Sequence, residues 1–268
     1  MVDAKNFTVC ILFYGDYPEL VTRSLSSLVK FNAVFDLRVG INDISQRTHA
    51  VLLTELQHFK DAGTACKIYE GVSPYYKYPL MRKIFHDAVD PITTPYVMWF
   101  DDDSYVKVET GAHWFDDVYS YFVGDSPVDI LGKVYTGVFA KGKKGLQGGQ
   151  PVWVESQPWY TGEPVSAGHQ PRFCTGGWWT TRMDILKRWS WPPAGEYHNC
   201  GDYLFGELFR QQDYRIKNFD TGIAVNADSF GRESRAKRRG TKFVPLAMDY
   251  QKNDKLNLSW MNILDGKV

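Results

Sequence analysis

The chain has 268 residues, which is long enough to bury one large core or two fused lobes. Lysine and arginine together number 31, as do aspartate and glutamate, and this balance excludes a strong net attraction to nucleic acid or to an anionic membrane. No apolar run reaches the ~18 residues of a membrane-spanning helix, and four widely separated cysteines with no metal-binding spacing indicate reduced thiols, so we expect a cytoplasmic protein without an integral membrane segment.

The first hundred residues alternate between predicted strands and predicted helices. Short apolar or β-branched runs bounded by turn residues predict strands at residues 7–14, 37–41, 66–69 and 96–100. The segments between them carry apolar residues at helical spacing; Pro18 opens the first helix and Gly63 ends the second. This alternation predicts an α/β fold, with a Rossmann-like, mostly parallel sheet flanked by helices and right-handed crossovers.

Polar residues follow three of the predicted strands. Tyr14 ends the first strand, Asn42 and Asp43 follow the second, and three aspartates follow the fourth. Because the carboxyl ends of parallel strands meet at one edge of a sheet, these residues predict a nucleotide-sized cleft at that edge. The sequence has neither a Gly-x-Gly-x-x-Gly motif nor a phosphate-binding loop ending in Gly-Lys-Ser/Thr, which argues against a dinucleotide-binding protein or an NTPase.

The three aspartates, Asp101, Asp102 and Asp103, are the strongest indication of a functional site. Adjacent like charges repel by up to about 4 kcal/mol per pair at ~4 Å in a moderately screened site, so we expect a cation beside them. Oxygen ligands on a loop suit Mg²⁺ or Mn²⁺, which often share a phosphate with the protein. The alternative is a solvated acidic turn that caps the next helix.

The pattern is looser beyond Val106. Strands are expected at residues 129–131 and 134–140, followed by a loop rich in glycine and lysine at 141–150 that could serve as a lid. Six of the nine tryptophans lie between residues 153 and 191. Their rings could bind sugars or bases, or fill a core, and the run Gly176-Gly177-Trp178-Trp179 suggests a close approach of the backbone to a ligand.

Asp202 lies in the first turn of a predicted helix whose inward face carries Leu204, Leu208 and Phe209. The helix dipole favours a carboxylate at this position, so helix capping and catalysis both fit the sequence. A strand is expected at residues 215–219. Residues 232–239 then carry five basic side chains and one glutamate.

The order of these features resembles the inverting family-two nucleotide-sugar glycosyltransferases with the GT-A fold, over roughly residues 7–230. Each motif is weak alone, but the order and spacing of the set are fairly specific. The matching features are the polar turn at residues 13–16, the acidic turn at 42–45, Arg82 on the helix before the metal-binding strand, an Asp-x-Asp motif at 101–103, a Gly-Gly segment at 176–177 followed by a helix at 181–189, and an acidic residue opening a late helix, Asp202.

This resemblance implies transfer of a sugar from a nucleoside diphosphate sugar, with uridine diphosphate favoured, to an acceptor hydroxyl with inversion, and Mn²⁺ or Mg²⁺ as cofactor. Asp202 would be the general base. The metal would be bound by Asp103 and Asp101. The expected donor contacts are Tyr14, Asn42, Asp43, Arg82, Asp101, Asp102, Arg235 and Arg238. The expected acceptor contacts are Gly176, Gly177, Trp178 and Trp179.

The sequence departs from the family pattern in two places. The common Glu-Asp pair before the late helix is Gly201-Asp202 here, so one carboxylate is left to act as the base. No histidine follows His198, so the carboxyl-terminal histidine that some relatives give to the metal is missing. We expect the basic segment at 232–239 to act as a donor lid in its place.

The sequence leaves two other functions open. The same transfer could act on a modified DNA or RNA base, gripped by residues 141–144 and 232–239. A non-catalytic carbohydrate-binding protein could use the tryptophans, whereas a nucleotidyltransferase is disfavoured because the amino-terminal glycine-rich loop is absent. We expect one compact domain with a donor half at residues 1–106, an acceptor-binding and catalytic half at 107–230, and a basic lid and tail at 231–268.

Overall fold

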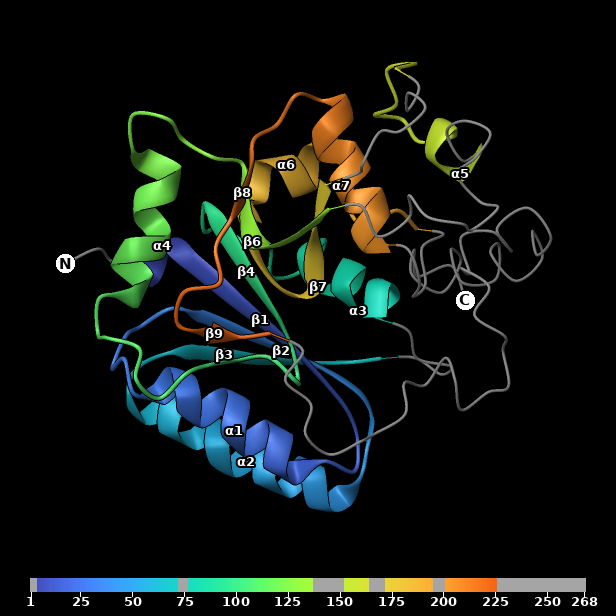
Figure 1. Ribbon diagram of the computed structural model, residues 1–268. Helices are drawn as coiled ribbons and strands as arrows, with labels where there is room; N and C mark the ends of the chain where they lie inside the picture. The colour runs from blue at the N-terminus through green and yellow to red at the C-terminus, as the bar shows by residue number, and fades with distance from the viewer. Residues whose placement is uncertain (1–3, 72–76, 137–151, 164–171, 195–200, 226–268) are drawn as a thin grey trace.

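A computed structural model of the chain describes residues 4–71, 77–136, 152–163, 172–194 and 201–225. These residues form a seven-stranded sheet in the order β3-β2-β1-β4-β7-β6-β8 (Figure 1). Its strands are β1 (Phe7–Gly15), β2 (Asp36–Ile44), β3 (Ala65–Glu70), β4 (Tyr96–Asp101), β6 (Ile130–Thr136), β7 (Arg172–Arg182) and β8 (Ile216–Asn218). Only β7 runs against the others within this sheet, so the predicted mostly parallel α/β sheet is confirmed.

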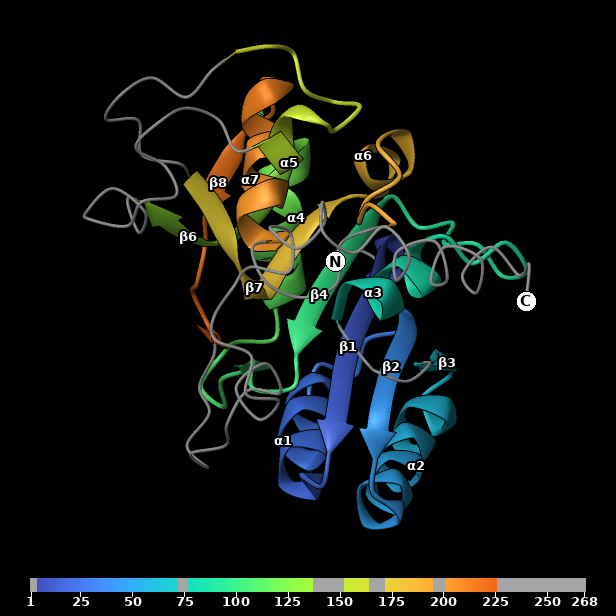
Figure 2. The ribbon, with the colours of Figure 1, turned by 90° about the vertical axis from the view of Figure 1, so that its right-hand side faces the viewer.

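Helices cover both faces of the sheet, and each face has its own apolar core. The helices are α1 (Pro18–Val29), α2 (Gln46–Asp61), α3 (Lys77–Phe85), α4 (Trp114–Val123), α5 (Val152–Glu155), α6 (Met183–Arg188) and α7 (Gly201–Gln211), after a short 3-10 turn at Ala4–Asn6. One core holds side chains of α1, α2 and α4, and the other holds side chains of α3, α6 and α7. Figure 2 shows β1, β2 and β4 side by side with their arrowheads at the same edge.

The second half of the chain differs from the sequence prediction in several places. One strand, β6, covers the strand expected at 129–131 and the start of the one expected at 134–140, with a shift of register between Gly132 and Val134. Residues 137–140 lie outside the described residues. The helix expected at 181–189 is shorter, because Thr181 and Arg182 still pair with neighbouring strands as part of β7. Helix α4 was not predicted, although its buried residues lie on one face.

Beyond β4, strands β5 (Tyr105–Val106) and β9 (Ile223–Ala224) form a separate two-stranded antiparallel sheet. It joins the segment after the three aspartates to the last described residues. Strands of both halves share one continuous sheet, and the predicted division at residue 106 stays a prediction. Among the helices of the described ranges, none combines the length and apolar character needed to cross a membrane.

A charged network ties the amino-end edge of the sheet to the turn after α3. The Asp87 carboxylate lies here, and Lys67 Nζ and the Tyr69 hydroxyl donate to its Oδ2 at 2.7 and 2.9 Å. Burial alone would raise the pKa of Asp87, but these two hydrogen bonds and those from the backbone of Val89 and Asp90 outweigh it and hold the pKa well below its ordinary value. The network therefore needs an ionised Asp87.

We expect the contribution of Asp87 to stability to be lost in acid. A depressed folded-state pKa adds stability above the ordinary carboxyl pKa of ~3.9, and this stability disappears as the pH falls through the folded-state value. The Asp87→Asn variant should therefore unfold more easily than the parent near neutral pH, with the difference shrinking below about pH 4. Urea denaturation over a pH series measures this, and the exposed Asp125→Asn serves as the control. Parallel curves for parent and Asp87→Asn would contradict the prediction.

Candidate functional site

The predicted polar edge exists at the carboxyl ends of β1, β2 and β4. Tyr14 pairs with Asn42 across β1 and β2, and Leu12 pairs with Asp101 across β1 and β4. Asn42 is buried, whereas Asp43 is exposed and adopts the left-handed region with φ of 48°. The three predicted polar segments therefore meet at one edge of the sheet.

Hydrogen bonds between the first two loops fix their geometry. The backbone N–H of Ser45 donates to the Gly15 carbonyl at 3.1 Å, and the hydroxyls of Ser45 and Thr48 donate to Asp16 Oδ1 at 2.5 and 3.2 Å. The Ser45 hydrogen bond holds the pKa of Asp16 below its ordinary value. Gly15 has a φ of 72°, a conformation that a side chain would disfavour. The loops that would face a nucleoside are thus pre-formed.

The three aspartates have three different environments. Asp101 is the last residue of β4, Asp102 is 3% exposed, and Asp103 is partly exposed. The hydroxyl of Ser24 on α1 donates to the backbone carbonyl of Asp102 at 3.0 Å, which anchors the loop to the helix. Of the three carboxylates, Asp101 and Asp103 are therefore the ones that solvent or a ligand can reach.

Lys77, at the start of α3, binds Asp101. Its Nζ lies 2.9 Å from Asp101 Oδ2, while Trp99 Nε1 donates to Asp101 Oδ1 at 2.8 Å. The ammonium also donates to the Gly176 carbonyl at 2.6 Å, and the lysine is buried. Both Asp101 oxygens thus accept hydrogen bonds from the protein, and the contacts of Asp101 to donor and metal stay predictions.

Sequence reasoning assigned the basic residue of this helix to Arg82, and the structure places Arg82 elsewhere. Its Nη1 donates to the carbonyls of Ser190 and Pro192 at 2.7 and 2.8 Å, so it holds the turn after α6. Lys77, the first residue of α3, was not among the predicted site residues. Its proximity to Asp101 depends on how α3 lies on the sheet, which no local pattern shows.

Asp202 lies across Gly176 from Lys77. Its Oδ2 accepts from the Gly176 N–H at 2.8 Å, and its Oδ1 accepts from the Tyr78 hydroxyl at 2.7 Å. Both partners lie outside α7, so capping of that helix does not account for these contacts. A β-carbon at Gly176 would lie 2.6 Å from both Asp202 Oδ1 and Lys77 Nζ, which is too close for a side chain.

The glycines and tryptophans of β7 have separate roles. Gly176 and Gly177 lie inside the strand, and the backbone of Gly176 reaches the two charged groups. Trp178 and Trp179 are 0% and 3% exposed, and Trp179 stacks on Trp99 with ring centroids 6.2 Å apart. Both indoles therefore pack in the core, which corrects the expectation that they face an acceptor.

The described residues contain no group of three or more histidine, cysteine or acidic side chains placed to hold a metal ion. Mg²⁺ and Mn²⁺ in nucleotide sites are usually held by one or two carboxylates together with substrate phosphates. Asp103 at the sheet edge fits that kind of site, in which the ligand completes the coordination. Arg235, Arg238 and the basic segments at 141–144 and 232–239 lie outside the described residues, and their roles stay predictions.

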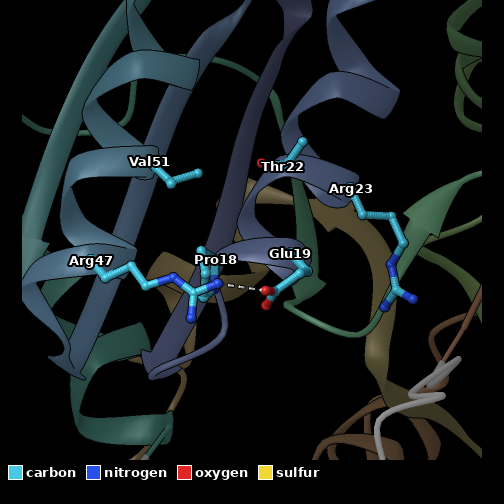
Figure 3. Close-up of a pocket in the computed structure, with 6 residues that line it drawn as sticks. All are labelled: Pro18, Glu19, Thr22, Arg23, Arg47 and Val51. Carbon is cyan, nitrogen blue, oxygen red and sulfur yellow. Dashed lines mark hydrogen bonds and ion pairs between the residues drawn. The ribbon is translucent and has the colours of Figure 1, made fainter.

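A shallow groove of about 400 Å³ lies against α1 and α2 (Figure 3). In it, Arg47 points toward Glu19 and pairs with it at 2.9 Å, whereas Arg23 points away and lies over the Tyr105 ring. The residues lining the groove are Pro18, Glu19, Thr22, Arg23, Arg47 and Val51. None of the predicted site residues is among them, and the lining comes from the first turns of α1 and α2, which follow the loops of the polar edge.

The chain is similar to known proteins in its fold and not in its sequence. The sequence matches no family model and no curated protein. The mannosyltransferase PcManGT from Pyrobaculum calidifontis, solved in complex with GDP-Man and Mn²⁺, superposes with a TM-score of 0.59 at 13% identity, over 97% of this chain and 69% of that one. The chain has the GT-A fold.

A second GT-A structure shows a looser likeness. Glucosyl-3-phosphoglycerate synthase from Mycobacterium tuberculosis, solved with Mn²⁺, uridine diphosphate and phosphoglyceric acid, has a TM-score of 0.47 at 10% identity, over 96% of this chain and 78% of that one. The GT-A architecture places the polar edge, with Asp101 and Asp103, at the carboxyl ends of the parallel strands.

Proposed function

We propose that the protein is a metal-dependent glycosyltransferase that moves a sugar from a nucleoside diphosphate sugar to an acceptor hydroxyl with inversion. One observation carries this proposal. The GT-A sheet brings the acidic segment after β4 and the Asp202 carboxylate of α7 to the two sides of Gly176, with Lys77 bound to Asp101 and to the Gly176 carbonyl. Asp101 and Asp202 are thus linked through Lys77 and Gly176. This arrangement suits a reaction in which the leaving group lies on the Asp101 side and the attacking hydroxyl on the Asp202 side.

The donor would bind along the polar edge. Tyr14, Asn42 and Asp43 would contact the nucleoside, with uridine favoured, and Asp101 would contact the ribose or the sugar. Asp103 and the diphosphate oxygens would hold Mn²⁺ or Mg²⁺. When bound, that ion would offset the negative charge that develops on the departing diphosphate.

Asp202 would act on the acceptor. Its carboxylate takes the proton of the acceptor hydroxyl while the hydroxyl oxygen bonds to the anomeric carbon and the bond from that carbon to the diphosphate oxygen breaks. The nucleoside diphosphate leaves with the bonding electrons. A single displacement of this kind inverts the anomeric carbon, so the anomer of the product tests the mechanism directly.

The alternatives gain less support from the described residues. A carbohydrate-binding protein that uses the tryptophans would need exposed rings, but Trp178 and Trp179 are in the core. A nucleic-acid acceptor depends on residues 141–144 and 232–239, which lie outside the described ranges. Because 31 basic and 31 acidic residues give the chain no net attraction to nucleic acid, we propose a sugar or glycan hydroxyl as the acceptor.

The deciding experiment is a panel of sugar nucleotides incubated with the protein and Mn²⁺, Mg²⁺ or a chelator. Release of nucleoside diphosphate should depend on the metal and should be fastest with one nucleotide. The proposal fails if no sugar nucleotide is hydrolysed and no nucleoside diphosphate with Mn²⁺ raises the melting temperature.

The Asp103→Ala variant tests the proposed metal ligand. Loss of this carboxylate should lower the affinity for nucleoside diphosphate in the presence of Mn²⁺ by at least about 10-fold, since even indirect partners of metal ligands are worth this much. Calorimetry with and without metal measures the effect, and Asp184→Ala, an exposed carboxylate on α6, is the control. Unchanged metal-dependent affinity in Asp103→Ala would refute the assignment.

A further inference from the structure

The first turn of α3 contacts both acidic sites through consecutive residues. Lys77 donates to Asp101 and to the Gly176 carbonyl, and Tyr78 donates to Asp202, which lies 124 residues further along the chain. The Gly176 N–H completes the path by donating to Asp202 at 2.8 Å. A continuous series of hydrogen bonds thus joins Asp101 to Asp202 and runs through α3 and β7.

Tyr78 is held rigidly in this position. Its side chain is buried at 3% exposure, and its ring packs edge-on against Trp191 with centroids 6.3 Å apart. A buried ring with fixed neighbours loses little further freedom when its hydroxyl bonds a carboxylate. The position of the hydroxyl is therefore fixed by the packing of the ring, and the hydroxyl orients the Asp202 carboxylate.

Gly201 explains how Tyr78 reaches Asp202. A β-carbon at position 201 would lie 2.1 Å from Tyr78 Cζ and 2.4 Å from the Tyr78 hydroxyl oxygen. A side chain at 201 and the Tyr78–Asp202 hydrogen bond cannot coexist in this geometry. A glycine at position 201 is thus required by the tyrosine that occupies the space of a side chain there.

We propose that Tyr78 and Lys77 are positioning residues that hold Asp202 and Asp101 in register, with Gly201 as the small residue that admits Tyr78. This inference rests on the proposed function, because it assigns these residues to orienting the general base. Displacement of a reacting group by about 1 Å can cost on the order of 100-fold in rate. The Tyr78 hydroxyl and the Gly176 N–H, which bind the two Asp202 oxygens, are well placed to prevent that displacement.

The Tyr78→Phe variant removes one hydroxyl and leaves the ring in place. We expect kcat for transfer to fall by about 10- to 100-fold, with the Kd for the donor nucleotide and the KM for the acceptor nearly unchanged, because only the orientation of the base is affected. The matched control is Tyr69→Phe, which removes a buried hydroxyl bonded to Asp87 at the opposite edge of the sheet. Both variants should be less stable than the parent, but Tyr69→Phe should keep its kcat.

The Gly201→Ala variant tests the steric half of the proposal. Its methyl group should push the Tyr78 ring aside and lower kcat to a similar extent, although neither Tyr78 nor Asp202 has changed. In a Tyr78→Ala background the methyl group has room, so adding Gly201→Ala should cost little more than Tyr78→Ala alone. Losses that multiply independently would show that Gly201 does not act through Tyr78.

These outcomes separate this inference from the proposed function. If the parent transfers sugar and Tyr78→Phe has the same kcat, the inference is overturned and the proposed function stands. If the parent hydrolyses no sugar nucleotide and no nucleoside diphosphate with Mn²⁺ raises its melting temperature, the proposed function fails together with the catalytic role of Tyr78. A denaturation cycle of Tyr78→Phe and Asp202→Ala then still tests the contact, because each substitution removes one partner of the hydrogen bond and additive destabilisation would disprove it.

Discussion

Replacement of Asp202 by asparagine is expected to lower the rate of sugar transfer by about 10²- to 10⁴-fold, the usual effect of removing a general base. Asparagine keeps the shape of the side chain but cannot take a proton at neutral pH. The asparagine can keep both hydrogen bonds of the aspartate. Its carbonyl oxygen can accept from the Gly176 N–H, and its amide N–H can donate to the Tyr78 hydroxyl oxygen. The fold and the affinity for the donor nucleotide should therefore survive.

The matched control for this variant is Glu207→Gln. Glu207 lies on the same helix, is 1% exposed and pairs with Arg210 at 2.9 Å, so its loss should destabilise the protein without slowing transfer in the folded molecules. Initial rates, donor affinity by calorimetry and melting temperature are measured for both variants. An Asp202→Asn protein that transfers sugar at the parental rate and only melts earlier would show that Asp202 is structural.

Replacement of Arg38 by methionine is expected to cause the largest loss of stability, about 2–4 kcal/mol in the free energy of unfolding. Arg38 is 3% exposed at the start of β2, and its guanidinium donates to Asp36, to the Tyr69 hydroxyl and to the Asp90 carbonyl, each at 2.8 Å. Methionine fills much of the space but leaves these acceptors without their donor. The expected value lies below that of a fully buried pair because the Asp36 side chain is 24% exposed.

A matched arginine on the surface provides the control. Arg47 pairs with Glu19 at 2.9 Å, but the two side chains are 67% and 53% exposed, so Arg47→Met should change the free energy of unfolding by less than about 1 kcal/mol (Figure 3). Urea denaturation of both variants measures the contrast. Because Arg38 lies at the edge opposite the proposed site, its variant should also keep its kcat at temperatures where it is folded. Equal destabilisation by the two substitutions would contradict the burial argument.

The apolar patterns of the first half were sufficient to predict its elements and their arrangement. Strands β1 to β4 of the sheet are short apolar runs, and the helices between them show the spacing of one buried face. These signals are local, because each run must bury its own apolar side chains. The order strand, helix, strand then implies parallel pairing, and that pairing places Tyr14, Asp43 and Asp101 at one edge.

The partners of the charged groups were decided only by the tertiary structure. Arg82 and Lys77 lie on the same helix, and the sequence favoured the first, whereas the packing of α3 on the sheet directs Lys77 to Asp101 and Arg82 to the turn after α6. The composition of β7 suggested tryptophans that face a ligand, yet their position between β4 and β6 buries them.

By itself, the sequence determined the α/β class and the acidic edge, and its resemblance to a glycosyltransferase family suggested Asp202 as the candidate base. It could not determine that Tyr78 reaches Asp202, or that Gly201 is needed for this contact. Contacts of this kind join residues 124 positions apart, and they depend on β7 lying antiparallel to β4 and on α3 and α7 sharing one face of the sheet. Local periodicity carries no information about such distant pairs, because it reports which face of an element is buried and not which element covers it.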